Sequence, residues 1–172
     1  MIFTLIGMPG SGKSCMGRSV SGKMKLALID SDKMIEKKVG KRLQEIINES
    51  GVDEFRRIEE EVLLSISTDE NKHAILSTGG SAVYSERGMQ YLKTLGKVIY
   101  LYCSPETIIE RIDNFADRGI VLKPGQDLRG LYEERHPLYQ KYADITVSCD
   151  GRAYTKYQKD IMTEISKIIE QK

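Results

Sequence analysis

The 172-residue chain has no tryptophan, only three cysteines, and almost no imbalance of charge. Cys15, Cys103 and Cys149 are widely separated and form no CxxC pair, which excludes a disulfide framework and a zinc site of the usual spacing. Lysine and arginine number 26 against 25 aspartates and glutamates, so the formal net charge is +1. This near-balance excludes a globally basic nucleic-acid binder and a polybasic membrane protein. Any function driven by charge must therefore be local.

Long apolar runs are also missing. No segment approaches the ~18 apolar residues of a membrane-spanning helix, and the N-terminal MIFTLIG lacks the basic and long apolar regions of an export signal. Together with the scattered cysteines, these absences predict a cytoplasmic protein with no membrane partner. The length is typical of one domain, so we expect residues 1–172 to form a single domain.

Short apolar runs alternate with longer segments of helical period, which is typical of an α/β protein with a parallel sheet. The runs expected to be strands are 2–6, 26–29, 74–76, 98–102 and 145–147. The segments expected to be helices are 13–24, 32–49, 55–67, 85–95, 105–114, 126–141 and 154 to the C-terminus. The apolar runs do not alternate with polar residues, which predicts that helices cover both faces of the sheet. Residues 48–54 and 117–127 are expected to be mobile connections.

The most specific motif is GMPGSGKS at residues 7–14, which fits the phosphate-binding pattern GxxxxGK[ST] between an expected strand and an expected helix. Its glycines let successive N–H groups point at phosphate oxygens, and the following helix adds its positive N-terminal end. Lys13 is expected to reach the β and γ phosphates and Ser14 to ligate Mg²⁺. The plainer alternative is a glycine-rich turn with an exposed lysine. The motif and its context favour a site for a nucleoside triphosphate.

The loop alone does not say where the γ-phosphate goes, because motors, switches and small-molecule kinases share it. Guanine recognition needs an Asn-Lys-x-Asp stretch, and Asn71-Lys72 is instead followed by His73 and Ala74. The chain is too short for a large ATPase. The remaining polar residues must therefore indicate the acceptor.

Two aspartates follow the second expected strand, at the edge where ligands collect in open α/β sheets. Asp30 is expected toward the metal, and Asp32 toward an acceptor hydroxyl that it orients and whose proton it takes. The alternative is that Asp32 is only the N-cap of the next helix. The spacing leaves both interpretations open.

The order of the motifs along the chain resembles that of the shikimate kinases, small P-loop enzymes of the nucleoside monophosphate kinase superfamily. The matching segments are 7–14, 29–32, 35–36, 40 with 46–47, 55–59, 75–80, Arg111, Arg118, 135–139 and 143–144. The resemblance implies a three-layer α/β/α fold with a five-stranded parallel sheet of order 2-3-1-4-5. It also implies a helical acceptor-binding segment at about 32–60 and a lid at about 113–126.

The loop and the resemblance together predict the site residues. The predicted catalytic residues are Lys13, Asp32 and Arg118. The predicted ATP-binding residues are Gly10, Ser11, Gly12, Lys13, Ser14, Cys15, Arg111, Arg118 and Arg152. The predicted acceptor-binding residues are Asp32, Arg56, Gly79, Gly80 and Arg135. The predicted Mg²⁺ ligands are Ser14 directly and Asp30 and Ser77 through water. The resemblance also gives Glu59 the role of holding the two acceptor-binding arginines.

Arg56 and Arg135 are implied to grip the acceptor carboxylate. A planar guanidinium fits a carboxylate through two hydrogen bonds, so two converging arginines suit an anion site. The alternative is that Arg56 belongs to a solvated helix face, where i,i+3 and i,i+4 ion pairs contribute only about 0.2 to 0.5 kcal/mol each. The matching Asp32 and the Gly79-Gly80 turn favour the site interpretation, while Arg57, Glu60 and Glu61 keep the solvated one.

Two positions depart from the family pattern. Ser81 replaces the third glycine of the turn, and its Cβ adds bulk and removes backbone freedom near the acceptor. Gly119 replaces the proline after the lid arginine, which makes lid closure cost more ordering entropy and predicts slow turnover or a relaxed substrate range. The predicted reaction is ATP-dependent phosphorylation of shikimate at its 3-hydroxyl by a monomer. The alternatives are a related kinase for another hydroxylated acid such as gluconate, and a catalytically silent nucleotide-binding regulator.

Overall fold

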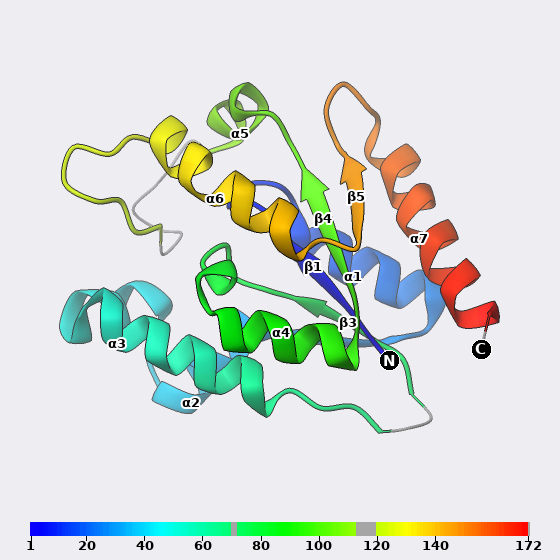
Figure 1. Cartoon of the computed structure of the whole chain (residues 1–172), viewed down its shortest axis with the longest axis horizontal. Helices are drawn as coiled ribbons and strands as arrows, with labels where there is room; N and C mark the ends of the chain where they lie inside the picture. The colour runs from blue at the N-terminus through cyan, green and yellow to red at the C-terminus, as the bar shows by residue number, and fades with distance from the viewer. Residues whose placement is uncertain (70–71, 113–119, 172) are drawn as a thin grey trace.

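The computed structural model describes residues 1–69, 72–112 and 120–171. Five strands form one sheet in the order β2-β3-β1-β4-β5, and every neighbouring pair is parallel (Figure 1). The strands are β1 (Ile2–Ile6), β2 (Ala27–Asp30), β3 (Ala74–Ser77), β4 (Gly96–Tyr102) and β5 (Ile145–Ser148). The predicted sheet and its strand order are therefore confirmed.

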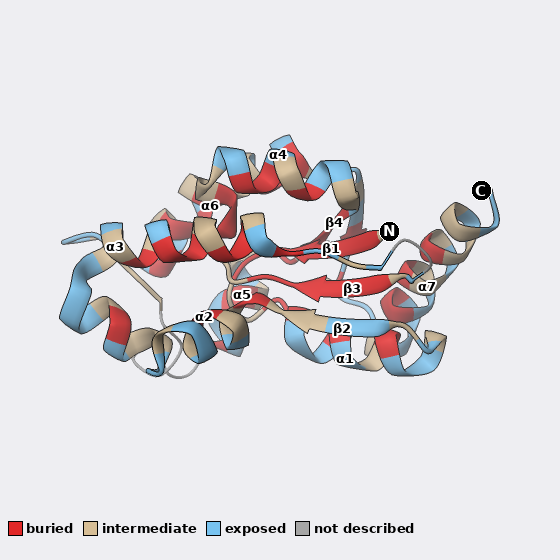
Figure 2. Cartoon of the chain, turned by 90° about the horizontal axis from the view of Figure 1, so that it is seen from below, coloured by how far each residue is buried: buried red, intermediate tan, exposed pale blue. Residues whose placement is uncertain are grey.

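Helices cover the two faces of this sheet. They are α1 (Lys13–Met24), α2 (Ser31–Val39), α3 (Leu43–Ser65), the short 3₁₀ helix η1 (Ala82–Tyr84), α4 (Glu86–Leu95), α5 (Pro105–Arg111), α6 (Leu128–Tyr142) and α7 (Tyr154–Glu170). Figure 2 shows α4 and α6 on one side of the sheet and α1 and α7 on the other. This is the predicted three-layer arrangement, and it leaves the carboxyl ends of the strands together at one edge.

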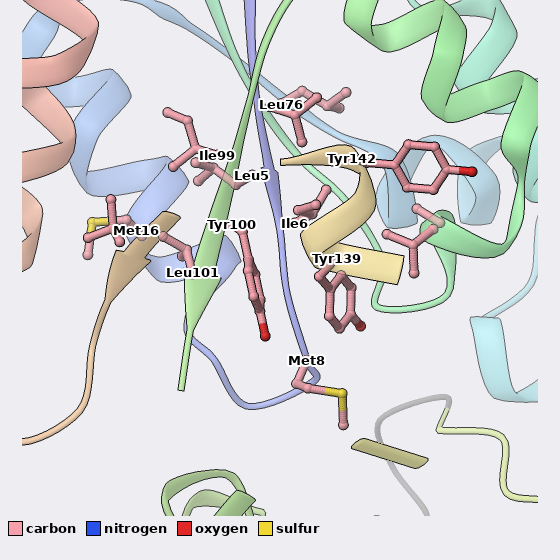
Figure 3. Packing of buried hydrophobic residues seen from close by; sticks show 14 of the residues in the cluster. Leu5, Ile6, Met8, Met16, Leu76, Ile99, Tyr100, Leu101, Tyr139 and Tyr142 are labelled. Carbon is pink, nitrogen blue, oxygen red and sulfur yellow. The ribbon is translucent and has the colours of Figure 1, made fainter. Parts of the chain in front are cut away.

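The hydrophobic core is built around the central strands. All five residues of β1 are buried, as the unbroken apolar run predicts. Met16 of α1 belongs to this core, and Tyr139 of α6 stacks on Tyr100 of β4 with ring centroids 5.1 Å apart (Figure 3). Full burial of one such apolar side chain contributes about 1.5 to 3 kcal/mol. The core thus fixes the strand ends from which the polar loops start.

The edge strand β2 differs from the prediction. Ala27 and Leu28 are exposed, and Leu28 keeps 42% of its surface accessible. The expectation that helices cover both faces of every strand is therefore wrong for β2. The physical reason is its place at the end of the sheet, where it has one neighbouring strand only.

The segment after β2 also differs from the single helix expected over 32–49. Helix α2 ends at Gly40, whose left-handed backbone (φ 77°) lets its N–H bond to the carbonyl of Glu36. Helix α3 then begins at Leu43 and is interrupted only at Gly51, so the loop expected over 48–54 is helical on both sides of that glycine. A small separate core joins the two helices, made of Ile35, Ile46, Phe55, Ile58 and Val62. The segment expected to bind the acceptor therefore packs as a helical hairpin.

Part of the predicted lid lies outside the residues that the structure describes. Arg118 and Gly119 fall within 113–119, which is outside the described residues, while 120–126 connect to the start of α6. Within the described ranges, none of the helices combines the length and apolarity needed to cross a bilayer.

Candidate active site

A cleft of about 370 Å³ opens at the carboxyl edge of the sheet. It is lined by the loop between β1 and α1, by α2 and α3, by the turn after β3 and by α6. Ten of the predicted residues line it: Gly10, Gly12, Lys13, Ser14, Cys15, Asp32, Arg56, Gly79, Gly80 and Arg135. Its other lining residues are Pro9, Leu43, Val52, Phe55, Thr78, Ser81 and Val121. Segments distant in sequence thus meet where ligands bind in open α/β sheets.

The loop before α1 has the backbone of a phosphate cradle. Gly10 and Gly12 adopt positive φ angles of 81° and 91°, and α1 begins immediately afterwards at Lys13. The predicted residue Ser11 is buried beneath the loop, and its N–H donates to the carbonyl of Met8 at 3.1 Å. The N-terminal end of α1 and the loop amides therefore offer donors to an anion in the cleft.

Lys13 is held inside this loop. Its ammonium group donates hydrogen bonds to the carbonyl oxygens of Gly7 at 2.8 Å and Met8 at 2.9 Å, and only 8% of the residue is exposed. Burial lowers the pKa of Lys13 to about 8, and the nearby charge of Asp32 opposes this shift. The lysine is thus a buried cation in a phosphate cradle.

The two aspartates after β2 have distinct roles. Asp30 is the N-cap of α2, because its Oδ1 accepts hydrogen bonds from the N–H groups of Asp32 at 3.1 Å and Lys33 at 3.2 Å. Asp32 lies in the first turn and lines the cleft instead. The alternative in which Asp32 caps the helix is therefore wrong by two residues.

In the part of the chain that the structure describes, the Asp32 carboxylate has an unpaired oxygen atom in the cleft. Its Oδ1 is buried and has no hydrogen-bond partner among the described residues. Burial raises the pKa of Asp32 to about 6, and the positive charge of Lys13 opposes the shift. A buried oxygen of this kind is satisfied when a donor such as a hydroxyl group enters the cleft.

The glycine turn after β3 fits closely against two carboxylates. A Cβ atom at Gly79 would lie 2.7 Å from Asp32 Oδ1 and 3.0 Å from Glu59 Oε1, so a side chain there would displace the Asp32 carboxylate and crowd that of Glu59. The N–H of Gly79 donates to Ser31 Oγ at 3.2 Å, and Tyr139 donates its hydroxyl to the carbonyl of Gly80 at 2.7 Å. The turn is therefore fixed from α2 and from α6.

Ser81 occupies the next position of the turn. Its backbone has φ −87° and ψ −11°, which any residue adopts, so the expected loss of backbone freedom has no consequence here. Its hydroxyl donates to Glu59 Oε1 at 2.9 Å. Burial raises the pKa of Glu59 to about 7, and the hydrogen bond from Ser81 opposes the shift. Within the described residues Glu59 forms no direct ion pair with Arg56 or Arg135, but the positive charges of both arginines act to lower its pKa, so the role given to it by the resemblance stays a prediction.

The two predicted acceptor arginines meet in the cleft. Arg56 comes from α3 and Arg135 from α6, and Arg135 is only 3% exposed. Tyr84 lies beside both, with the Cζ of Arg56 4.3 Å and the Cζ of Arg135 5.2 Å from its ring centroid. Tyr84 belongs to none of the sequence motifs, so the sequence alone does not predict it as a site residue. Arg57, in contrast, pairs with Glu54 and Glu61 on the exposed face, as its solvated interpretation predicts.

The remaining predicted residues lie beside the cleft or away from it. Arg111 is the last residue of α5, and its guanidinium donates to the Sγ of Cys103 at 3.5 Å. A Cβ atom built at Gly10 would lie 3.8 Å from the Cβ of Arg111, so Arg111 lies next to the phosphate loop. Arg152 donates to the carbonyl of Ser148 and to Asp160, and it does not line the cleft. Arg118 lies outside the described residues.

The described residues suit a magnesium ion carried by phosphates. They contain no group of three or more acidic, histidine or cysteine side chains able to hold a metal by themselves. Mg²⁺ in phosphoryl-transfer sites takes one or two protein oxygens together with phosphate oxygens and water. Ser14 is exposed in the cleft, and Asp30 lies opposite the buried Ser77 in the register of β2 and β3. These hydroxyl and carboxylate oxygens fit that requirement.

The comparisons with known proteins agree with this geometry. The family model "SKI: Shikimate kinase" matches residues 9–170. A shikimate kinase from Sulfurihydrogenibium sp. (strain YO3AOP1) is 31% identical over 163 residues, which cover 95% of this chain and 96% of the relative. One from Pseudomonas paraeruginosa (strain DSM 24068 / PA7) is 34% identical over 166 residues, covering 95% of both.

Solved structures give the same result. A shikimate kinase from Acinetobacter baumannii in complex with shikimate has a TM-score of 0.80 at 30% identity and covers 99% of this chain and 93% of its own. A gluconokinase from Sinorhizobium meliloti 1021 has a TM-score of 0.55 at 12% identity, covering 98% and 93%, and shows a shared fold only. The family uses ATP and Mg²⁺. The chain belongs to the shikimate kinase family and is a P-loop phosphotransferase.

Proposed function

We propose that the cleft transfers the γ-phosphoryl group of ATP to the 3-hydroxyl of shikimate, giving 3-phosphoshikimate and ADP. The observation that carries the proposal is the meeting of three features in one cleft: a phosphate loop, two arginines and a buried carboxylate oxygen without a partner. Shikimate has the matching groups, a carboxylate and hydroxyls on one small ring. The family assignment supports the same reaction.

On the acceptor side, Arg56 and Arg135 bind the carboxylate, because each guanidinium presents paired donors to it. Asp32 accepts a hydrogen bond from the reacting hydroxyl and then its proton as the oxygen attacks phosphorus. With a pKa of about 6, Asp32 is mostly ionised at neutral pH and is able to do so. Gly79 and Gly80 keep the turn thin, so that the ring of the acceptor lies against the backbone.

On the nucleotide side, the amides of Gly10, Gly12, Lys13, Ser14 and Cys15 surround the phosphates, and Ser11 stays a predicted ATP-binding residue whose N–H already donates to the carbonyl of Met8. Lys13 stabilises the charge that spreads over the γ-phosphoryl oxygens, and the β-phosphate oxygen leaves with ADP. When bound, Mg²⁺ neutralises part of the phosphate charge; Ser14 would hold it directly, and Asp30 and Ser77 through water. The resemblance adds Arg118 on the phosphates and Arg111 and Arg152 near adenine, and these three roles stay predictions.

The acceptor is tested by ADP release in the presence of shikimate, gluconate or no acceptor. Of the two acceptors, we expect only shikimate to give more ADP than the reaction without an acceptor. Arg135→Lys should raise the shikimate KM by about tenfold, since a point charge replaces a two-donor fork. The matched control is Arg57→Lys on the exposed face of α3, which should leave that KM unchanged.

Three results would contradict the proposal. ADP formation with gluconate but not with shikimate would make the chain a kinase for another hydroxylated acid. Tight ATP binding without turnover on any acceptor would make it a silent regulator. Near-normal activity of Lys13→Ala would remove the phosphate-loop mechanism.

We also propose that the chain works as a monomeric kinase domain over residues 1–172, with an acceptor-binding segment at about 32–60 and a lid at about 113–126. The three free cysteines support a reducing compartment such as the cytoplasm. Sedimentation of the active enzyme as a single 19.5 kDa species would test the oligomeric state.

A further inference from the structure

Both arginines of the acceptor site contact the same aromatic side chain. Tyr84, the last residue of η1, has Arg56 Cζ at 4.3 Å and Arg135 Cζ at 5.2 Å from its ring centroid. Arg135 also donates from Nε to the Tyr84 hydroxyl at 3.2 Å. One side chain therefore touches two cations that come from helices α3 and α6.

Neither arginine forms a direct ion pair with a described carboxylate; Glu59 acts on both only through its charge. In the ranges 1–69, 72–112 and 120–171, neither Arg56 nor Arg135 forms an ion pair with a carboxylate. A carboxylate partner would occupy the same donors that an anionic acceptor needs. An aromatic face attracts a guanidinium through its ring quadrupole and leaves the hydrogen-bond donors at the edge of the guanidinium available.

We infer that Tyr84 is a positioning residue for the acceptor's carboxylate. Its ring orients Arg56 and Arg135 together, and its hydroxyl fixes the rotation of Arg135 through Nε. The inference rests on the proposed function, because it assigns these arginines to the acceptor. It adds a residue outside the motifs to the site.

The Tyr84 hydroxyl is itself anchored. It donates to Glu134 Oε1 at 2.6 Å, and the other oxygen of Glu134 accepts from Lys123 Nζ at 2.7 Å and Gln126 Nε2 at 3.0 Å. Tyr84 is thereby connected to the segment that precedes α6. Because the hydroxyl makes these bonds while the ring makes the cation contacts, two substitutions separate the two contributions.

The test compares Tyr84→Leu and Tyr84→Phe with the unmodified enzyme in steady-state kinetics. Loss of the ring in Tyr84→Leu should raise the shikimate KM by about tenfold or more and change the ATP KM by less than about twofold. Tyr84→Phe keeps the ring and should raise the shikimate KM by about threefold. The matched control is Tyr91→Phe on α4, whose hydroxyl bonds the carbonyl of Ile66 and whose loss should change neither KM.

A second probe separates positioning from general damage to the fold. The methyl ester of shikimate keeps the hydroxyls but lacks the negative charge, so its KM should be similar in Tyr84→Leu and in the unmodified enzyme. A rise in KM for the ester equal to that for shikimate would overturn the inference, because the effect would not pass through the arginines.

The outcomes for the two proposals are distinguishable. If the unmodified enzyme does not phosphorylate shikimate, the proposed function falls and the inference falls with it. If it does, and Tyr84→Leu is folded with an unchanged shikimate KM, only the inference is overturned. If Tyr84→Leu does not fold, Tyr84→Phe decides: a threefold rise supports the inference and an unchanged KM overturns it.

Discussion

Lys13 and Asp32 face the same cleft with pKa values that burial moves in opposite directions. The pKa of Lys13 falls to about 8 and that of Asp32 rises to about 6, because each charged form loses hydration. The proposed reaction needs Lys13 positive and Asp32 negative. Both conditions hold only between these two pKa values, so the two residues define a working range of pH.

We therefore expect kcat/KM for shikimate to follow a bell-shaped pH profile. It should fall as the pH drops below about 6, where Asp32 gains a proton, and as it rises above about 8, where Lys13 loses one. The measurement is the rate from about pH 5 to 9.5 with shikimate and Mg-ATP both well below their KM values, so that the free enzyme is observed. Arg57→Gln, outside the cleft, serves as the control and should keep both limbs. A kcat/KM that does not change over this pH range would show that the ionisation of Lys13 and Asp32 does not limit the reaction.

At the scale of elements, the conformation of the α2–α3 hairpin, the proposed acceptor-binding segment, depends on one residue of α3. Gly51 has φ 83° and ψ 168°, a backbone conformation that is essentially restricted to glycine. A Cβ atom at this position meets nothing within 4 Å, so the backbone angle, and not crowding, requires glycine. The kink separates the part of α3 that starts at Leu43 from the part that carries Arg56.

We expect Gly51→Ala to lower the free energy of unfolding by about 1 to 3 kcal/mol, because alanine is strained in this conformation. Relief of that strain by straightening α3 should also move the Leu43 end of the hairpin away from the cleft and raise the shikimate KM. Urea denaturation and steady-state kinetics measure the two effects. Gly22→Ala, in the exposed part of α1 with equally open surroundings, should be neutral or stabilising. Equal behaviour of the two variants would contradict a requirement for the kink.

The elements that the sequence predicts well are those whose signal is local. The apolar run of β1 and the phosphate loop predict their conformation from adjacent residues, and both agree with the structure. The roles of Asp30 and Asp32 depend on which residue starts α2, and a shift of two residues exchanges the cap and the cleft carboxylate. The first residue of such a helix is set by side-chain hydrogen bonds, and the spacing of apolar residues along the sequence does not show them.

Contacts between distant elements are the part that sequence patterns did not predict. Tyr84 meets Arg56 from α3 and Arg135 from α6, and Ser81 meets Glu59 across 22 positions of the chain. At Ser81 the sequence predicts added bulk and lost backbone freedom but not the hydrogen bond, because that partner depends on how η1 packs against α3. The resemblance points to the two arginines, but only the packing of the helices shows that both contact Tyr84.

For the whole molecule, a net charge of +1 conceals a cleft in which ionisable groups are buried without full pairing. Asp32 and Glu59 both lie within 3.0 Å of the point where a Cβ atom of Gly79 would be, and burial raises the pKa of each. Their negative forms are therefore less stable in the folded protein than in the unfolded chain. The site that binds the acceptor is expected to reduce the stability of the fold at neutral pH.

The sign of this effect gives a prediction for the stability of the whole protein. Between about pH 4 and 7 the folded state keeps protons on Asp32 and Glu59 that the unfolded chain releases, so the free energy of unfolding falls as the pH rises through that range. Between about pH 5 and 7.5 the free energy of unfolding of the unmodified protein should fall by about 2 to 4 kcal/mol more than that of the double variant Asp32→Asn/Glu59→Gln, which has neither carboxylate. Urea denaturation at the two pH values measures the difference. The matched control, Asp53→Asn/Glu133→Gln, removes two exposed carboxylates that lie outside the cleft and should behave as the unmodified protein. If all three proteins lose stability equally, the buried carboxylates of the cleft do not destabilise the fold. The raised pKa of Asp32 would then no longer explain why kcat/KM falls below about pH 6.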